Sequence, residues 1–336
     1  MSESPSNTQE RTPLRKRLER AAGRLALRML VTPLRALPLS VNQKVGRLLG
    51  GMLYYLLGRY RRVALMNLQL VFGQELTPAE RRRMARRVFQ HFGAVATEFV
   101  KLPGLRRDDL DRLVTVDGLE HLEQAYQGGR GVLLITGHFG NWEVLARWLT
   151  THGHTLTVVA RRANDAKTEE LLRGTREKNG VQIVNRGGSA REILRALQQN
   201  TIVGILPDQN DADVFVPFFG LPTGTVDGPA QIHLRTGAPL LFAWCVRAPD
   251  NRFHVTLEPP EVIPPTGDRQ ADVERVMTLV NARLEAQIRR YPEQWLWLHH
   301  RWKASPGVFA DGAEQARRIK MPSNRYKQEI QGRHER

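Results

Sequence analysis

Residues 131–143 read Gly131-Val132-Leu133-Leu134-Ile135-Thr136-Gly137-His138-Phe139-Gly140-Asn141-Trp142-Glu143. A short apolar run that ends at a glycine predicts a buried strand that stops at a sharp turn. The first reactive side chain beyond the turn is His138, and the carboxylate of Glu143 follows five positions later. We therefore expect both side chains at the C-terminal edge of a sheet, where α/β folds place their chemistry.

His138 and Glu143 are too far apart in sequence to share one face of a helix, because five residues turn a helix by about 140°. They converge if His138 lies in the turn and Glu143 in the first turn of the next helix. Glu143 would then be kept ionised by the helix dipole and hold the imidazole in one tautomer. Gly137 and Gly140 would permit close approach by a substrate. The competing interpretation is a structural or solvated histidine.

The chain beyond Leu113 alternates apolar runs with helical patterns. Strands are predicted at 114–116, 132–135, 156–160, 181–184, 202–206 and 240–246, with 253–257 as an antiparallel neighbour of the last. Helices are predicted at 119–127, 142–151, 167–179, 189–198, 228–236 and 269–290. This alternation predicts an α/β fold with a central, mostly parallel sheet flanked by helices.

The region from Leu14 to about Leu102 is predicted to be helical, with leucines and alanines at three- and four-residue spacing and arginines between them. Pro33 and Pro38 should divide it into separate helices. Thr77 and Glu80 form a capping-box pattern around a proline, which marks a helix start. The arginines that follow are either a solvated helix face or a surface for anionic lipid.

The 336 residues carry a formal charge of +16, which favours an anionic partner such as nucleic acid, a membrane surface, a phosphorylated substrate or an acidic carrier protein. The single cysteine, Cys245, excludes an intramolecular disulfide and a multi-cysteine metal site. The longest uncharged apolar stretch, residues 48–58, is too short to span a bilayer. The polar N-terminus does not resemble a cleavable signal peptide.

Other polar groups follow predicted strands. Arg161 could clamp a phosphate, and Asp208 could bind substrate or orient a partner, although both residue types are also common in surface pairs and turns. The apolar run 214–219 suggests a wall for an acyl chain, a membrane-facing lip or core packing. The aromatic segment 295–303 holds two adjacent histidines, for which a structural role is favoured over a metal site.

Taken in order, these pieces resemble the lipid A late acyltransferases, the lauroyl and myristoyl acyltransferase family. The resemblance covers roughly residues 40–303. It rests on Asn67-Leu68, Phe72, the 137–143 block, Arg161, Asp208-Gln209, Val216-Pro217-Phe218-Phe219-Gly220 and Trp297-Leu298-His299-His300-Arg301-Trp302-Lys303. Members of the family usually have a more hydrophobic N-terminal anchor than this chain, whose short apolar N-terminal segment is interrupted by arginines.

The resemblance implies transfer of a fatty acyl chain from acyl carrier protein, or coenzyme A, to a hydroxyl of a lipid A precursor. His138 would be the general base and Glu143 its orienting partner. Arg161, Asp208, Gly140 and Asn141 would bind substrate. Backbone N–H groups around Gly140 and Asn141, or a nearby cation, are the candidates for holding the oxyanion. No cofactor or metal is implied. The expected partners are acyl carrier protein, a phosphorylated glycolipid and an anionic membrane surface on the cytoplasmic face of the bacterial inner membrane.

Three alternatives stay open at this stage. The acceptor could be another lysophospholipid or glycolipid, the chain could be a non-catalytic protein that binds anionic lipid, or His138 could belong to a metal hydrolase. Nucleic acid is disfavoured because no helix-turn-helix, zinc finger or stacking platform is found. The expected organisation is a disordered N-terminus over 1–12, a helical membrane-associating region over 13–104, an α/β acyltransferase domain over 105–303 and a basic surface tail over 304–336.

Overall fold

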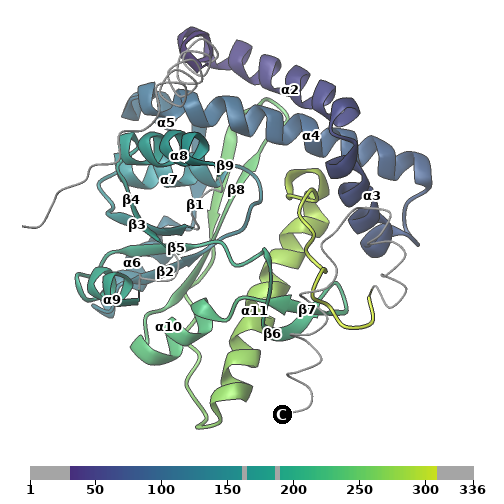
Figure 1. The fold of residues 1–336 in the computed structure, drawn as a ribbon. Helices are drawn as coiled ribbons and strands as arrows, with labels where there is room; N and C mark the ends of the chain where they lie inside the picture. The colour runs from purple at the N-terminus through teal and green to yellow at the C-terminus, as the bar shows by residue number, and fades with distance from the viewer. Residues whose placement is uncertain (1–30, 161–164, 186–189, 309–336) are drawn as a thin grey trace, which may run out of the picture.

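The computed structural model describes residues 31–160, 165–185 and 190–308. Within these ranges the chain begins with helices and continues as an α/β unit (Figure 1). Residues 31–36 are helical, and after them come α2 (Leu39–Leu56), α3 (Gly58–Phe72) and α4 (Pro78–Lys101), followed by the short helices η1 (Leu102–Gly104) and α5 (Arg107–Leu113). Helix α2 begins directly after Pro38, and α4 begins with the predicted capping box of Thr77 and Glu80.

Glycines allow α2 and α4 to pack against each other at close range (Figure 1). A Cβ atom on Gly50 would overlap the carbonyl oxygen of Phe89, and one on Gly93 would overlap the carbonyl oxygen of Gly46. Missing side chains at such positions let two helix backbones approach until they touch. One side of α2 is therefore fixed to the rest of the molecule by backbone contact.

The α/β unit contains, among the described residues, a seven-stranded sheet in the order β1-β9-β8-β2-β5-β3-β4. Its strands are β1 (Val114–Asp117), β2 (Val132–Ile135), β3 (Leu156–Ala160), β4 (Val181–Asn185), β5 (Ile202–Ile205), β8 (Leu240–Arg247) and β9 (Phe253–Leu257). Strands β8, β2, β5, β3 and β4 are parallel, while β9 runs antiparallel to β8 and parallel to β1. The mostly parallel sheet and its antiparallel neighbour confirm the predicted α/β fold.

Helices cover both faces of this sheet. They are α6 (Leu119–Gln127), α7 (Trp142–Thr151), α8 (Ala166–Lys178), α9 (Ala190–Gln198), α10 (Gly228–Thr236) and α11 (Arg269–Arg290). Alternate residues of β2 enter different hydrophobic clusters: Leu134 packs with α7, and Leu133 belongs to the cluster that includes α11. The continuous apolar run of β2 is thus explained by burial on both faces.

A second, two-stranded sheet pairs β6 (Asn210–Phe218) with β7 (Leu221–Thr225) and packs against α11. Val214, Val216 and Phe218 are buried, whereas Phe215 between them is 36% exposed. This period of two is that of a strand with one face in the core. Of the three interpretations of the 214–219 run, the structure supports core packing.

Candidate active site

His138 lies just beyond the C-terminal end of β2, and Asp208 lies just beyond that of β5. These two strands are neighbours in the parallel sheet, with Ile135 opposite Ile205, so their ends place the two side chains together. Nδ1 of His138 is 2.8 Å from Oδ1 of Asp208. The sheet topology, rather than sequence proximity, therefore creates this pair.

The Asp208 carboxylate is fixed on several sides. Its Oδ2 accepts hydrogen bonds from the backbone N–H of His138 at 2.8 Å and from the indole N–H of Trp295 at 2.9 Å. Burial opposes ionisation of Asp208, but the charge of His138 and these hydrogen bonds outweigh it and lower its pKa to about 2. Asp208 is consequently a carboxylate at neutral pH.

An ionised Asp208 determines the tautomer of His138. A carboxylate only accepts hydrogen bonds, so Nδ1 of the ring must carry a proton, and in the neutral imidazole Nε2 is the nitrogen with the lone pair. Nε2 lies 3.5 Å from Nε2 of Gln209, and the ring packs edge-on against Trp142 with centroids 5.0 Å apart. The His138 side chain is 23% exposed, so this nitrogen is the one left for a reacting group.

Glu143 has a different partner from the one expected from the sequence. Its carboxylate pairs with Arg176 of α8, with Nη2 of the arginine 2.5 Å from Oε1, and also accepts a hydrogen bond from the indole N–H of Trp142 at 2.9 Å. The hydrogen-bond partner of His138 Nδ1 is Asp208, and Glu143 instead pairs with the cationic side chain of Arg176. Burial acts against the charge of Arg176, but Glu143 overcomes it and raises the arginine's pKa.

A cavity of about 480 Å³ adjoins the histidine. Its polar lining consists of Thr136, His138, Trp142, Glu143, Arg176 and Gln209. The remaining lining is apolar and comes mostly from α7, α8 and the strands β2 to β5, with Leu145, Leu149, Leu156, Leu172 and Val181 among it. A reactive nitrogen at the mouth of an otherwise apolar cavity fits a substrate with a polar reacting group and a hydrocarbon part.

Gly140 and Asn141 build the turn rather than line this cavity. The N–H of Gly140 donates to the carbonyl of Gln294, and the N–H of Asn141 donates to the carbonyl of Cys245, each at 2.8 Å. Neither N–H is therefore available to an oxyanion, which corrects the expectation from the sequence. Gly140 has a φ of +58°, and a Cβ there would overlap the Cys245 carbonyl, so a glycine is required for the turn itself.

The side chain of Asn141 caps α7 and connects it to α4. Its Oδ1 accepts from the N–H of Val144 at 3.1 Å, and its amide donates to Glu98 at 2.7 Å. Glu98 is 1% exposed and forms a bidentate ion pair with the buried Arg247. His91, also on α4, donates from Nε2 to the carbonyl of Gly140 at 2.9 Å. Helix α4 thus positions the turn that carries His138.

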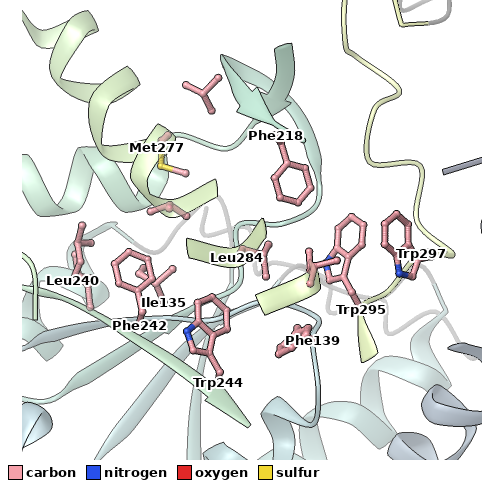
Figure 2. Packing of buried hydrophobic residues seen from close by; sticks show 14 of the residues in the cluster. Ile135, Phe139, Phe218, Leu240, Phe242, Trp244, Met277, Leu284, Trp295 and Trp297 are labelled. Carbon is pink, nitrogen blue, oxygen red and sulfur yellow. The ribbon is translucent and has the colours of Figure 1, made fainter. Parts of the chain in front are cut away.

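The aromatic segment near residue 295 supports the site from the other side. The rings of Trp295 and Trp297 lie 4.7 Å apart, and Phe218 packs 5.6 Å from Trp295. Figure 2 shows these rings beside Leu284, with Phe139 near Trp295. Phe139 forms a β-bridge with Trp295, which brings the indole N–H to Asp208. His299 accepts the N–H of Asn210 at 2.9 Å, which agrees with a structural role for the adjacent histidines.

Two residues of this site were missed by sequence reasoning. Arg176 lies 33 positions after Glu143 in an ordinary amphipathic helix, and no local spacing marks it. Trp295 could have been suspected, because an indole N–H in a buried aromatic segment needs an acceptor. Arg161 lies outside the described residues. Within those residues no group of three or more His, Cys, Asp or Glu side chains is placed to hold a metal ion.

Comparison with known proteins identifies the family of the chain. The family model described as bacterial lipid A biosynthesis acyltransferase matches residues 14–304. The lipid A biosynthesis lauroyltransferase of Escherichia coli K12 is 28% identical over 276 residues, which cover 80% of this chain and 88% of that protein. The E. coli K12 lipid A biosynthesis palmitoleoyltransferase is 27% identical over 80% of this chain and 87% of its own length.

A further relative comes from a different group of bacteria. The phosphatidylinositol mannoside acyltransferase of Mycobacterium tuberculosis H37Rv is 28% identical over 223 residues, or 64% of this chain and 69% of that protein. These relatives are all named as acyltransferases, which supports assignment of this chain as an O-acyltransferase. Because the family model spans most of the sequence, the chain belongs to the bacterial lipid A biosynthesis acyltransferase family.

Proposed function

We propose that this protein transfers a fatty acyl chain from a thioester donor to a hydroxyl of a lipid A precursor, with His138 as the general base. The observation that carries the proposal is the His138–Asp208 pair, 2.8 Å apart, at the mouth of a largely apolar cavity. Acyl transfer needs a base that faces the acceptor hydroxyl and a dry channel for the hydrocarbon chain.

The reaction begins when the acceptor hydroxyl donates its proton to Nε2 of His138 as its oxygen attacks the thioester carbonyl. The imidazolium that results is stabilised by the Asp208 carboxylate on Nδ1. Collapse of the tetrahedral intermediate breaks the carbon–sulfur bond, and His138 returns the proton to the leaving thiolate. The products are an ester and a free thiol, and no covalent enzyme intermediate is formed.

The oxyanion of the tetrahedral intermediate needs a partner other than the N–H groups of Gly140 and Asn141. Among the described residues that line the cavity, Arg176 is the only lysine or arginine. Arg176 lines the same cavity as His138, and Glu143 holds its guanidinium in place. We therefore assign electrostatic stabilisation of the developing oxyanion to Arg176, with Glu143 as its positioning residue.

The donor is proposed to be acyl carrier protein, with coenzyme A as the alternative carrier, and the acceptor a phosphorylated glycolipid. The relatives named for lipid A synthesis favour a lipid A precursor, and the mycobacterial relative keeps another glycolipid open as acceptor. A net charge of +16 suits an acidic carrier and a phosphorylated lipid alike.

A membrane surface is the proposed place of reaction. No helix in the described part of the chain combines the length and the apolar character needed to cross a bilayer. However, α2 and the start of α3 expose a ridge of apolar side chains, defined by Val41, Leu48, Leu49, Met52, Leu53, Tyr55, Leu56, Leu57 and Tyr60. Exposed lysine and arginine side chains flank it, including Lys44, Arg47 and Arg59.

This ridge fits the interface of an anionic bilayer. An amphipathic helix with apolar residues on one side and basic residues beside them lies in the headgroup region. The opposite side of α2 is in glycine contact with α4, and the side chains of the ridge remain 38% to 73% exposed in the described structure. We propose that it docks the enzyme on the cytoplasmic face of the inner membrane.

The test is mass spectrometry of lipids after incubation with acyl-carrier-protein thioester and a lipid A precursor. We expect the wild-type protein to add one acyl chain, and His138→Ala to lower the rate by about 10²–10⁴-fold while the protein stays folded. Full activity of His138→Ala would exclude the base. No transfer by the wild type to this precursor, with transfer to a lysophospholipid or another glycolipid, would change the acceptor. Lipid binding without any transfer would support a non-catalytic protein.

A further inference from the structure

The cavity beside His138 runs along one face of the sheet, from the C-terminal ends of the strands to their N-terminal ends. Ala160, the last residue of β3, lines it near the catalytic edge, and Leu156, the first residue of that strand, lines it at the far end. Val181, the first residue of β4, is paired with Leu156 and also lines it. The four steps along the strand from residue 156 to residue 160 correspond to about 13 Å of depth.

Gly204 lies halfway along this passage. It is buried in β5, where it pairs with Val158 of β3 on one side and Leu134 of β2 on the other. Both neighbours line the cavity, and Gly204 lines it as well. Residues that pair in register share a face of the sheet, so a side chain at position 204 would point into the cavity.

A glycine at this position is not explained by the backbone. Gly204 is not among the glycines with a positive φ, so any residue could adopt its conformation. The other residues of β5 are Ile202, Val203 and Ile205, as expected for a central parallel strand. A glycine inside such a strand weakens it and marks a place where something else approaches closely.

The space around Gly204 shows what a side chain would do. A Cβ there would lie 3.3 Å from Cδ1 of Leu156 and 3.4 Å from Cγ1 of Val158, both side chains that line the cavity. A methyl group would press on these neighbours, and the branches of a valine would extend into the open passage. The mouth at His138 and Gln209 would be left unchanged.

We propose that Gly204 determines the length of the acyl chain that the enzyme accepts, by keeping the inner half of the cavity open. A chain that ends before the level of Val158 does not need this opening. A longer chain passes Gly204 and reaches the apolar end formed by Leu149, Leu156 and Val181. This inference rests on the proposed acyl transfer, because it takes the cavity to be the site of the donor's hydrocarbon chain.

The experiment offers the full-length protein an equimolar mixture of acyl-carrier-protein thioesters from octanoyl to stearoyl, with the lipid acceptor, and reads the product chain lengths by mass spectrometry. Gly204→Ala should shift the product distribution to shorter chains, and Gly204→Val should lower the ratio of long to short products by about tenfold or more. Val181→Ala, which enlarges the inner end, should shift the distribution the other way.

The matched control is Val203→Ile, which enlarges a buried residue of the same strand on the opposite face. It should leave the product distribution unchanged, so a general loss of stability is separated from a block in the cavity. Unaltered chain lengths in a folded Gly204→Val protein would overturn the inference. The milder Gly204→Ala variant serves if the valine variant does not fold.

Failure of the proposed acyl transfer can be told apart from failure of the proposed role of Gly204. If the wild-type protein transfers no acyl chain, the same proteins are titrated with free fatty acids of increasing length. Loss of binding by Gly204→Val for long fatty acids only would support the role of Gly204 without the reaction. Equal binding of every length by the variant and the wild type would contradict it.

Discussion

Asp208 binds His138 twice, through Oδ1 to the ring at 2.8 Å and through Oδ2 to the backbone N–H at 2.8 Å. One carboxylate thereby sets the orientation of the imidazole and the position of the peptide that carries it. Because Trp295 donates to Oδ2 as well, that oxygen is committed to accepting hydrogen bonds. The arrangement leaves Oδ1 to control which ring nitrogen is protonated.

Asp208→Asn should disable the base without removing it. The amide oxygen of the asparagine must take the place of Oδ2, where two donors converge, so the NH₂ group faces Nδ1 of His138. Nδ1 then accepts a hydrogen bond, the proton moves to Nε2, and the lone pair needed for catalysis is lost. We expect kcat to fall by about 10²–10⁴-fold with little change in the melting temperature.

Trp295→Phe provides the comparison for that variant. It removes one hydrogen bond from Asp208 but keeps the carboxylate against His138. Its effect on kcat should be clearly smaller than that of Asp208→Asn. If both variants lose activity equally, Asp208 does not act through the tautomer of the histidine.

Glu143 and Arg176 should behave as one unit. Their side chains are only 6% and 21% exposed, so removal of either partner leaves a charge with little access to water. Glu143→Gln and Arg176→Met should each lower the free energy of unfolding by about 1–3 kcal/mol. The double variant should lose less than the sum, with a coupling of about 0.5–3 kcal/mol.

Urea denaturation of the two single variants and the double variant measures this coupling. Strict additivity would mean that the ion pair does not act as a unit in solution. In the activity assay, Arg176→Met should lower kcat more than it changes KM, since the proposed interaction with the oxyanion exists only in the transition state.

The order of helices and strands was predictable because each element carries its own signal. The buried strand 132–135, the helix 142–151 and the antiparallel strand 253–257 all follow from apolar runs, caps and turn residues. The 210–225 hairpin was harder to recognise, because its alternation is obscured by prolines and adjacent aromatic residues.

The partners within the site could not be read from sequence with the same success. Asp208 is 70 residues from His138 and meets it only because β5 lies next to β2 in the sheet. Glu143 is close in sequence and looked like the natural partner, but Arg176 from α8 binds its carboxylate. Sequence spacing predicts which helix or strand carries a residue, whereas the order of the strands in the sheet determines which residues contact each other.

The stability of the protein should fall as the pH is lowered from neutrality, partly because of His91. Burial, followed by the nearby charge of Arg247, lowers the pKa of His91 from 6.5 to about 3. Below pH 6.5 the unfolded chain therefore binds a proton that the folded chain does not, and the free energy of unfolding decreases until about pH 3. His299 and His300, whose pKa values burial lowers to about 4, act in the same direction.

His91→Gln tests this contribution. The glutamine amide can donate to the Gly140 carbonyl as Nε2 of His91 does, but it does not titrate. Urea denaturation from pH 7 to pH 4.5 should show a shallower loss of stability in the variant than in the wild type, by up to about 1.4 kcal/mol per pH unit. Parallel curves would show that His91 is protonated in the folded protein or is not buried in solution.

The apolar ridge on α2 makes a separate prediction about membranes. Met52 and Leu56 are 52% and 73% exposed and lie one helical turn apart, so both would enter the headgroup region together. Met52→Glu combined with Leu56→Glu removes apolar area and adds charges that an anionic surface repels. Since burial of one large apolar side chain is worth about 1.5–3 kcal/mol, binding to phosphatidylglycerol vesicles should weaken by about tenfold or more.

The matched control is Val262→Glu, because Val262 is also 52% exposed but lies outside the ridge. Cosedimentation with vesicles should find this control close to the wild type, and binding should weaken with added salt as the arginines beside the ridge are screened. If the double variant and the control bind equally, the enzyme reaches its lipid substrate through another surface.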